Sequence, residues 1–341
     1  MQKRIFKFIS FVSMSVAAAF LGGCTKVSSV KNSNEVVVYA YDSFVGEWGP
    51  GKELKKRFEE KTGLTLTFVE GEDAVSLLSK AILEKDNPNA DILIGLDNNT
   101  AKKAIDADIL LEYKPENAEK LIPSELEDAL GGSWKITPYD YSHFAIIYNT
   151  ESKIPAPKSL EDLTDSKYQK SLILMDPRTS TPGLGFAAWT VAIFGDNYLD
   201  YWKALRPNIL AVTPGWSSGW GMFEKGEAPL VISYTTSPAA TVEYNGSTTY
   251  KALVFDEGHP MQVEGAAILK NAKNPDGAKK FMDFFISNEA QSVLPLTQWM
   301  YPANKNVDLP ESYKIGAATP AKTVSADPEK VADAVAKIMA Q

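Results

Sequence analysis

Short apolar runs alternate with amphipathic stretches along most of this chain. Residues 35–42 (EVVVYAYD) are rich in β-branched side chains and polar at both ends, which predicts a buried strand. Residues 50–62 place Leu54 and Phe58 four positions apart, between a proline and a glycine, which predicts an amphipathic helix with a start and a stop. Alternating helices and apolar strands are typical of a mostly parallel sheet that helices cover on both faces.

The alternation continues through the rest of the chain. Further strands are predicted over 64–70, 91–96, 135–149, 171–176 and 229–237, and further helices over 75–85, 184–195, 278–294 and 327–340. Polar residues gather where the predicted strands end. In open α/β sheets, ligands bind beyond the carboxyl ends of the strands. These polar groups therefore form one candidate site: Tyr41-Asp42, Glu72-Asp73, 97–99, 176–183 and 234–237.

The N-terminal segment has the features of an export signal. Lys3, Arg4 and Lys7 precede an apolar run over 8–20, which is too short to span a membrane comfortably. The sequence Leu21-Gly22-Gly23-Cys24 then resembles a bacterial lipobox. We expect a lipoprotein signal peptide over 1–23, a lipidated thiol at Cys24 and a polar tether over 24–34. The alternative is an ordinary signal peptide that happens to contain a cysteine.

Composition narrows the possible chemistry. The 341 residues suit about two domains or one large two-lobed domain, and the formal net charge of −8 does not favour nucleic acid as a partner. Cys24 is the single cysteine, so the chain has no internal disulfide and no free thiol for catalysis once Cys24 is lipidated. We expect His143 and His259 to be packing or surface residues. We expect no metal site, cofactor or catalytic residue, because no motif for them occurs.

Several segments, in this order and spacing, resemble the thiamine-binding proteins of bacterial ABC importers. They are YDSFVGEWGPG (41–51), EDAVSLL (72–78), GLDNN (95–99), DPRTSTPGLG (176–185), GWSSGWGMFEKGE (215–227), SYTTSPA (233–239) and QWMYP (298–302). The resemblance implies an α/β protein with the type II periplasmic-binding-protein fold, in which two lobes with mostly parallel sheets are joined by two hinge strands. It also implies a monomer at the cell membrane or in the periplasm, which is not an enzyme and delivers its ligand to an ABC transporter permease.

The resemblance also implies where the lobes divide. Lobe 1 would comprise residues 35–138 and 263–341, and lobe 2 would comprise 139–262. The hinges are expected near 137–142 and 262–266. The ligand would lie between the lobes, with Asp73 contributed by lobe 1 and the loop at 176–185 by lobe 2.

Thiamine carries a fixed positive charge and a flat aminopyrimidine, so its site needs aromatic faces, a carboxylate and hydroxyl groups. The ligand would be thiamine, thiamine phosphate or thiamine diphosphate. The residues that match the family's ligand contacts are Tyr41, Trp48, Asp73, Ala74, Ser180, Thr181, Trp216, Tyr234, Thr235, Thr236, Ser237 and Trp299.

Some of these positions have simpler explanations. Asp73 also suits the N-cap of the helix that follows it, and Asp176 and Arg178 are expected to brace their loop rather than contact the ligand. The family often has a tyrosine where this chain has Ala240, and Tyr244 is the candidate to replace it.

Three other classes of protein compete with this interpretation. A ferric-ion-binding protein of the same fold would use two adjacent tyrosines, but here Tyr234 is followed by Thr235. A thiamine-processing enzyme on the same scaffold would use a cysteine in the cleft, but Cys24 lies in the predicted tether. A structural surface lipoprotein would need no ligand site. Glu257 and Glu264, near the second crossover, are expected to be solvated or to belong to the hinge.

Overall fold

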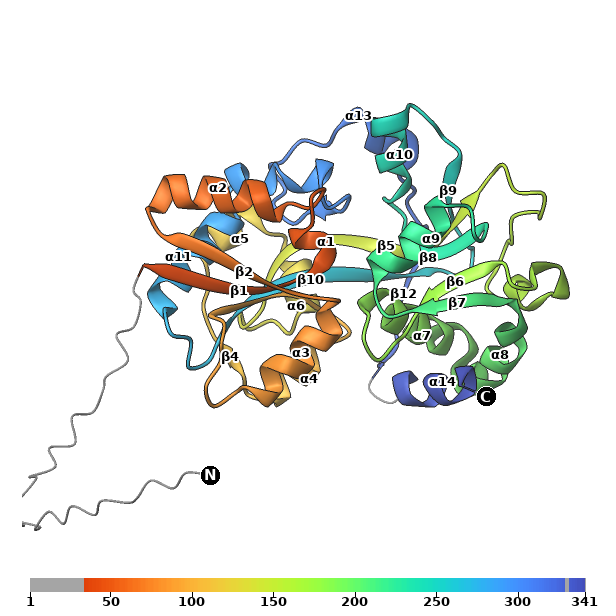
Figure 1. Ribbon diagram of the computed structural model, residues 1–341, viewed down its shortest axis with the longest axis horizontal. Coiled ribbons are helices and arrows are strands. Elements are labelled where there is room, and N and C mark those ends of the chain that lie inside the picture. Colours follow the sequence, from red (N-terminus) through yellow and green to blue (C-terminus); the bar gives the residue numbers. More distant parts are fainter. Residues whose placement is uncertain (1–33, 329–330, 341) are drawn as a thin grey trace, which may run out of the picture. The chain divides into compact units, whose positions relative to one another are not determined.

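The computed structural model describes residues 34–328 and 331–340, which belong to one compact unit (Figure 1). The predicted signal peptide over 1–23, Cys24 and nearly all of the predicted tether lie outside the described residues.

Twelve strands of the described chain join in one hydrogen-bonded network with the main order β2-β1-β3-β10-β5-β8-β6-β7. Parallel pairing, as expected from the apolar runs, occurs in β2-β1-β3 and in β8-β6-β7. The strands are β1 (Glu35–Tyr41), β2 (Thr65–Gly71), β3 (Ile92–Asp97), β4 (Leu110–Leu111), β5 (Thr137–Asn149), β6 (Leu172–Met175), β7 (Ile209–Thr213), β8 (Leu230–Tyr234), β9 (Tyr250–Leu253), β10 (His259–Leu269), β11 (Tyr301–Pro302) and β12 (Thr323–Val324).

Two long antiparallel strands connect the parallel groups. β5 and β10 pair with each other in the middle of the sheet, where His143 lies opposite Met261 and Thr137 lies opposite Ala266. On its other side β10 pairs with β3 from Glu264 to Ile268, and beyond the central region β5 pairs with β8. Both strands therefore run from one half of the sheet into the other (Figure 1). The segments predicted as hinges, 137–142 and 262–266, lie within this central pairing.

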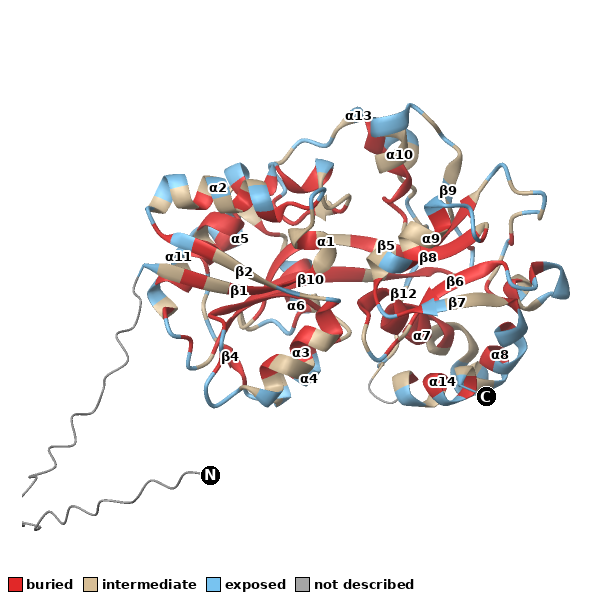
Figure 2. Ribbon diagram, viewed as in Figure 1, coloured by how far each residue is buried: buried red, intermediate tan, exposed pale blue. Residues whose placement is uncertain are grey.

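Helices pack on both groups of strands and bury two separate apolar cores (Figure 2). One core surrounds β1, β2 and β3, and the other surrounds β6 and β8. The helices are α1 (Asp42–Val45), α2 (Gly51–Thr62), α3 (Ala74–Leu83), α4 (Ala101–Asp106), α5 (Ala118–Leu121), α6 (Ser124–Ala129), α7 (Thr181–Phe194), α8 (Tyr198–Leu205), α9 (Trp216–Glu224), α10 (Pro238–Asn245), α11 (Pro275–Phe285), α12 (Asn288–Gln291), α13 (Glu311–Gly316) and α14 (Val331–Met339). We call the part around β1–β3 the first half and the part around β6–β8 the second half.

The last two helices correct one expectation. Residues 263–341 were assigned to lobe 1, but α13 packs against α10, and α14 packs against α7 and α8, which are helices of the second half. Val331, Val335 and Ile338 of α14 are part of the apolar core of the second half. The cause is the apolar face of α14, which is buried against these helices although its sequence lies beyond the second crossover.

The loop after β6 becomes helical earlier than expected. The sequence predicted a helix from 184, whereas α7 begins at Thr181, directly after Ser180 in extended conformation. Pro182 suits the first turn of a helix because its missing N–H would have no partner there. Gly185 is needed for packing, since a Cβ atom at this position would lie 2.2 Å from the ring of Phe144 on β5. The loop and the start of α7 are thus held close to β5.

Candidate functional site

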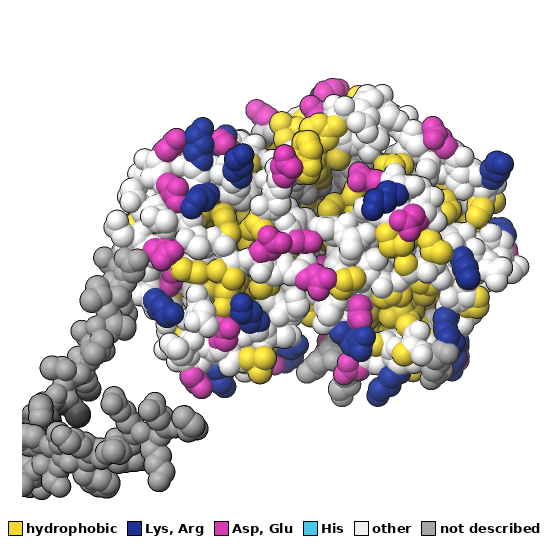
Figure 3. Space-filling model, in the orientation of Figure 1, with side chains coloured by type: hydrophobic (Ala, Val, Ile, Leu, Met, Phe, Trp, Pro, Cys, Tyr) yellow, Lys and Arg dark blue, Asp and Glu magenta, His cyan; other side chains and the backbone are white. Residues whose placement is uncertain are grey.

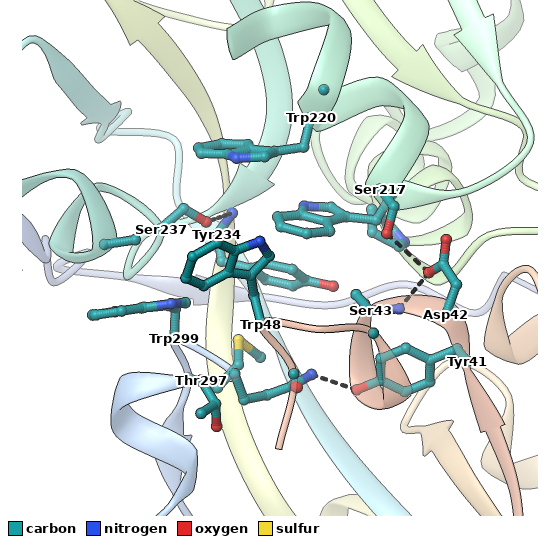
Figure 4. Close-up of a pocket in the computed structure, with 18 of the residues that line it drawn as sticks. Tyr41, Asp42, Ser43, Trp48, Ser217, Trp220, Tyr234, Ser237, Thr297 and Trp299 are labelled. Carbon is teal, nitrogen blue, oxygen red and sulfur yellow. Dashed lines mark hydrogen bonds between the residues drawn. The ribbon is translucent and has the colours of Figure 1, made fainter. Parts of the chain in front are cut away.

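A cavity of about 650 Å³ lies between the two halves of the sheet. Its wall comes from α1 and the loop after it, from the starts of α3, α7 and α9, from the end of β8, from α10 and from residues 297–300. Figure 4 shows how side chains from these separate elements point toward one space. In Figure 3, hydrophobic side chains gather beside a hollow in the upper middle of the molecule, with acidic side chains nearby.

Most of the predicted ligand contacts lie in this wall. They are Tyr41, Trp48, Asp73, Thr181, Trp216, Tyr234, Ser237 and Trp299. The first and last of these residues, Tyr41 and Trp299, are more than 250 positions apart in sequence, and the fold brings them to the same cavity. Their role as ligand contacts stays a prediction.

The other four predicted contacts are buried behind the wall rather than in it. Ala74 donates its backbone N–H to the Asp73 carboxylate, over 2.7 Å. Ser180 is fully buried directly before α7. β8 ends at Tyr234, so the hydroxyls of Thr235 and Thr236 turn inward and hydrogen-bond the Ser142 hydroxyl, over 3.2 and 3.0 Å. Their role as ligand contacts likewise stays a prediction.

Asp73 lies where three helices begin. Its Oδ1 atom accepts hydrogen bonds from the backbone N–H groups of Ala74 at the start of α3, over 2.7 Å, and of Thr181 at the start of α7, over 3.1 Å. Its Oδ2 atom accepts one from Trp216 at the start of α9, over 3.3 Å. Asp73 is the N-cap that the sequence suggested, and it also satisfies two helix starts of the second half.

Burial of Asp73 disfavours its ionised form, whereas its hydrogen bonds favour that form. Burial raises the pKa of the Asp73 carboxyl to about 7, while hydrogen bonds from the backbone amides of Thr181, Ala74 and Trp216 oppose the rise. The positive ends of the helices favour the ionised form as well. With two hydrogen bonds to Oδ1 and one to Oδ2, the carboxylate has one acceptor position left, on Oδ2. Asp73 is also part of the cavity wall.

Aromatic rings form the side of the cavity that belongs to the second half. The indoles of Trp216 and Trp220 are stacked, with ring centroids 5.4 Å apart and an interplanar angle of 14°. The Nε1–H of Trp216 donates to the Ser233 hydroxyl over 2.9 Å, which fixes the ring. The Tyr234 ring stacks on Phe144. Fixed aromatic faces of this kind suit a flat or cationic ligand.

Three further aromatic side chains meet at the mouth of the cavity. Trp48, which is 75% exposed, contacts the Tyr244 ring edge-on, and Tyr244 contacts Trp299 edge-on, with centroids 6.2 and 5.4 Å apart. Tyr244 thus supplies an aromatic ring beside Ala240, where the family often has a tyrosine. Trp299 has a φ angle of 57°, a left-handed conformation that is strained for a bulky residue and that accumulates at functional sites.

With this geometry established, comparison with known proteins is informative. The family of bacterial extracellular solute-binding proteins matches residues 53–330. The thiamine-binding periplasmic protein of Brucella melitensis is 38% identical over 96% of this chain and 95% of that protein. The protein of the same name from Escherichia coli is 39% identical over 87% and 89%. A solved periplasmic thiamin binding protein has a TM-score of 0.81 at 36% identity, covering 90% of this chain and 96% of that one.

The chain belongs to the bacterial extracellular solute-binding protein family. The prediction of a type II periplasmic-binding-protein fold is confirmed, and the relatives are binding proteins, not enzymes, as predicted. A ferric binding protein from Campylobacter jejuni is similar at a TM-score of 0.72 and 22% identity, which shows a shared fold alone. Within residues 34–328 and 331–340, no helix has both the length and the apolar character to cross a bilayer.

The charged side chains that line the cavity of this solute-binding protein are all acidic. They are Asp42, Glu47, Asp73, Glu224 and Glu264, and no Lys, Arg or His among residues 34–328 and 331–340 lines the cavity. Its potential therefore favours a cation. Across the described part of the chain, no group of His, Cys, Asp and Glu is arranged to hold a metal ion. His143 and His259 lie outside the wall, and His259 is buried against the backbone of Phe144 and Phe255.

The loop at 176–185 behaves as expected in one respect. The backbone N–H and the guanidinium of Arg178 donate to the Asp176 carboxylate, over 2.6 to 3.0 Å, and neither residue lines the cavity. These two residues brace the loop, which confirms the prediction.

Several residues of the wall were not predicted as ligand contacts, although Asp42 was placed at the candidate site by its position at a strand end. Asp42 of α1 accepts a hydrogen bond from the Ser217 hydroxyl of α9, over 2.9 Å, and so joins the two halves (Figure 4). Trp220 lies four positions after Trp216, so the helical spacing of the two tryptophans was an available signal. Glu264 was expected to be solvated or part of the hinge. It lies on the central strand β10, but it is 4% exposed and faces the cavity.

Proposed function

We propose that this protein is an extracytoplasmic, lipid-anchored receptor that captures thiamine in the cavity between its two halves and delivers it to an ABC importer. The ligand binds while the halves are apart, and bending of β5 and β10 then brings the halves together around it. The closed form is the one that docks on the permease.

One observation carries the choice of ligand: stacked indoles and buried carboxylates line a cavity without a basic side chain. Thiamine requires this combination, because its thiazolium ring is a permanent cation and its aminopyrimidine is flat and donates hydrogen bonds. The cavity volume of about 650 Å³ is also in the range of small-molecule sites. The names of the relatives support the same ligand.

Isothermal titration calorimetry with thiamine, its mono- and diphosphate and the isolated aminopyrimidine tests the proposal. We expect saturable, one-to-one binding of thiamine, and much weaker binding of the pyrimidine, which lacks the cation. Tighter binding of the esters would indicate that the start of α7 accepts phosphate, and weaker binding would restrict the ligand to free thiamine. Absence of thiamine binding, or degradation of thiamine during the titration, would contradict the proposal.

The lipid anchor has its own test. Replacing Cys24 with serine removes the thiol that lipidation requires, so we expect the Cys24→Ser protein to leave the membrane fraction of cells while it still binds thiamine. Fractionation of cells followed by immunoblotting measures the distribution. A Cys24→Ser protein that stays with the membrane as fully as the wild type would show that another element holds it there.

A further inference from the structure

Three buried carboxyl groups lie in a row across the central strands. Glu264 on β10 is paired in register with Asp97 on β3 and with Asp140 on β5. Their exposed fractions are 4%, 0% and 0%. None of them takes part in a salt bridge among the described residues. Adjacent like charges without a counter-ion are costly in a protein interior, so the row must hold protons in the empty protein.

Hydrogen bonds distinguish the outer members of the row. Asp97 accepts from the Thr100 hydroxyl and from the backbone and side chain of Asn99, so the turn after β3 satisfies it. Both oxygens of Asp140 are buried with no hydrogen-bond donor among the described residues. A buried carboxylate without donors is unstable, so Asp140 is the member that favours the protonated form.

Glu264 has the donors that an ionised carboxylate needs. Its Oε2 atom accepts from the hydroxyls of Tyr41 and Tyr139, over 3.0 and 2.8 Å, and its Oε1 atom accepts from the Gln262 amide over 2.8 Å. The Gln298 amide in turn donates to the Tyr41 hydroxyl, so side chains of β1, β5, β10 and the 297–300 loop position the carboxyl. Glu264 is also the one member of the row in the cavity wall.

The groups that face the row do not supply positive charge. Besides the three acids, they are Asp73, Tyr41, Tyr139, Tyr234 and Tyr313, which are all neutral or acidic. Burial raises the pKa of Glu264 to about 7 and that of Asp97 to about 6. Burial and the neighbouring Glu264 raise the pKa of Asp140 well above its usual range. Because Asp140 lies opposite Glu264 in the central pairing, the ionisation of each of these two carboxyls depends on that of the other.

We propose that Glu264 is the counter-charge for the positively charged ring of the ligand, and that the arriving cation displaces into solvent a proton held by the buried pair of Glu264 and Asp140. This inference rests on the proposed function, because it assigns a partner to the fixed charge of thiamine. The charge of Asp73 is already partly compensated, since three helix starts direct backbone N–H groups at it. The donors to Glu264 are neutral side chains. Glu264 is thus fully ionised only when a bound cation balances its negative charge.

The proposal has a definite pH dependence. The empty site holds the proton below the raised pKa of Glu264, about 7, and binding must then remove it. Thiamine affinity should therefore rise as the pH increases from 6 to 8 and level off above that range. A neutral ligand needs no counter-charge, so its affinity should rise less, by the part that Asp73 contributes as it ionises over the same pH range.

Titration calorimetry with thiamine and with 3-deazathiamine, in which an uncharged thiophene replaces the thiazolium ring, tests the role of Glu264. In the Glu264→Gln protein we expect thiamine affinity to fall about tenfold or more, and 3-deazathiamine affinity to stay within about twofold. The matched control is Glu243→Gln, an exposed acid outside the cavity wall, which should leave both affinities unchanged. An equal loss for the two ligands in Glu264→Gln would overturn the proposal and leave thiamine binding by the wild type intact. If the wild type binds neither ligand, the proposed function itself fails.

A second variant tests the proton without removing Glu264. Heats of thiamine binding at pH 6 in buffers of different ionisation enthalpy give the number of protons released, which we expect to be about one for the wild type. Asp140→Asn replaces the acid opposite Glu264 with a neutral amide that cannot hold the proton or repel the Glu264 carboxylate, so release should fall well below the wild-type value. Wild-type binding without proton release at pH 6, or release that is unchanged in Asp140→Asn, would overturn the proposal. Thermal unfolding of each variant confirms that it is folded.

Discussion

Replacing Asp73 with alanine is expected to weaken thiamine binding about 30-fold or more. This corresponds to about 2 kcal/mol, the scale for removing one partner of a buried charge-assisted hydrogen bond. The variant loses the carboxylate that faces the cavity, and it also leaves the backbone N–H groups of Thr181 and Trp216 without their acceptor. Since those groups belong to the second half and Asp73 to the first, closure around the ligand should weaken together with direct contact. Calorimetry with thiamine measures the loss.

Glu72→Ala is the matched control for this experiment. Glu72 precedes Asp73, carries the same charge, is exposed and does not line the cavity. It should bind thiamine as the wild type does. The free energy of unfolding of Asp73→Ala should fall by about 1–3 kcal/mol because helix starts lose their caps. A variant that is destabilised but binds thiamine with unchanged affinity would limit Asp73 to a structural role.

Replacing Trp216 with alanine should weaken thiamine binding about tenfold or more. The indole offers a fixed face to the cavity, held by the stacked Trp220 ring and by the hydrogen bond to Ser233. Cation–π attraction of a desolvated charge reaches about 2 kcal/mol, and the contact area of the ring adds to this. Calorimetry at one pH, compared with the wild type, gives the change in affinity.

The phenylalanine variant separates the ring from its hydrogen bond. Trp216→Phe keeps an aromatic face and should retain most of the affinity, but the quenching of tryptophan fluorescence by thiamine should become smaller. Trp134→Phe, outside the cavity wall, should leave both the affinity and the quenching unchanged. Equal affinities for the alanine and wild-type proteins would show that the ligand does not stack on Trp216.

The spacing of apolar residues was sufficient to predict the helices and strands whose structure depends on residues close by in sequence. β1, β2 and β3 and the helices between them occur within a few residues of their predicted bounds, because their apolar spacing is strong. The start of α7 was placed late, since the turn residues of TSTPG favour a loop when taken alone. Helix formation there is supported from a distance, because Asp73 accepts the N–H of Thr181 and Gly185 lets the helix approach Phe144.

The polar residues at the ends of the predicted strands also indicated many of the cavity residues. They did not show which side chains line the cavity and which are packed behind its wall. Ser180 and Thr181 are adjacent, yet Thr181 lines the cavity and Ser180 lies behind it. Likewise Tyr234 and Ser237 face the cavity, while Thr235 and Thr236 turn toward Ser142. The direction of each side chain depends on where β8 ends and α10 begins. If the strand ended one residue later, the side chains that face the cavity and those that face away from it would change places.

The sequence by itself determined the succession of helices and strands, the aromatic and acidic segments of the site and, through its signature segments, the family. Only the tertiary structure decided that Asp73 serves three helix starts, that α14 packs with the second half, and that Asp97, Glu264 and Asp140 stand side by side. The physical reason is range. Periodicity and capping depend on residues a few positions apart, whereas the pKa of Glu264 depends on carboxyl groups more than 100 positions away, which meet through the register of the central strands.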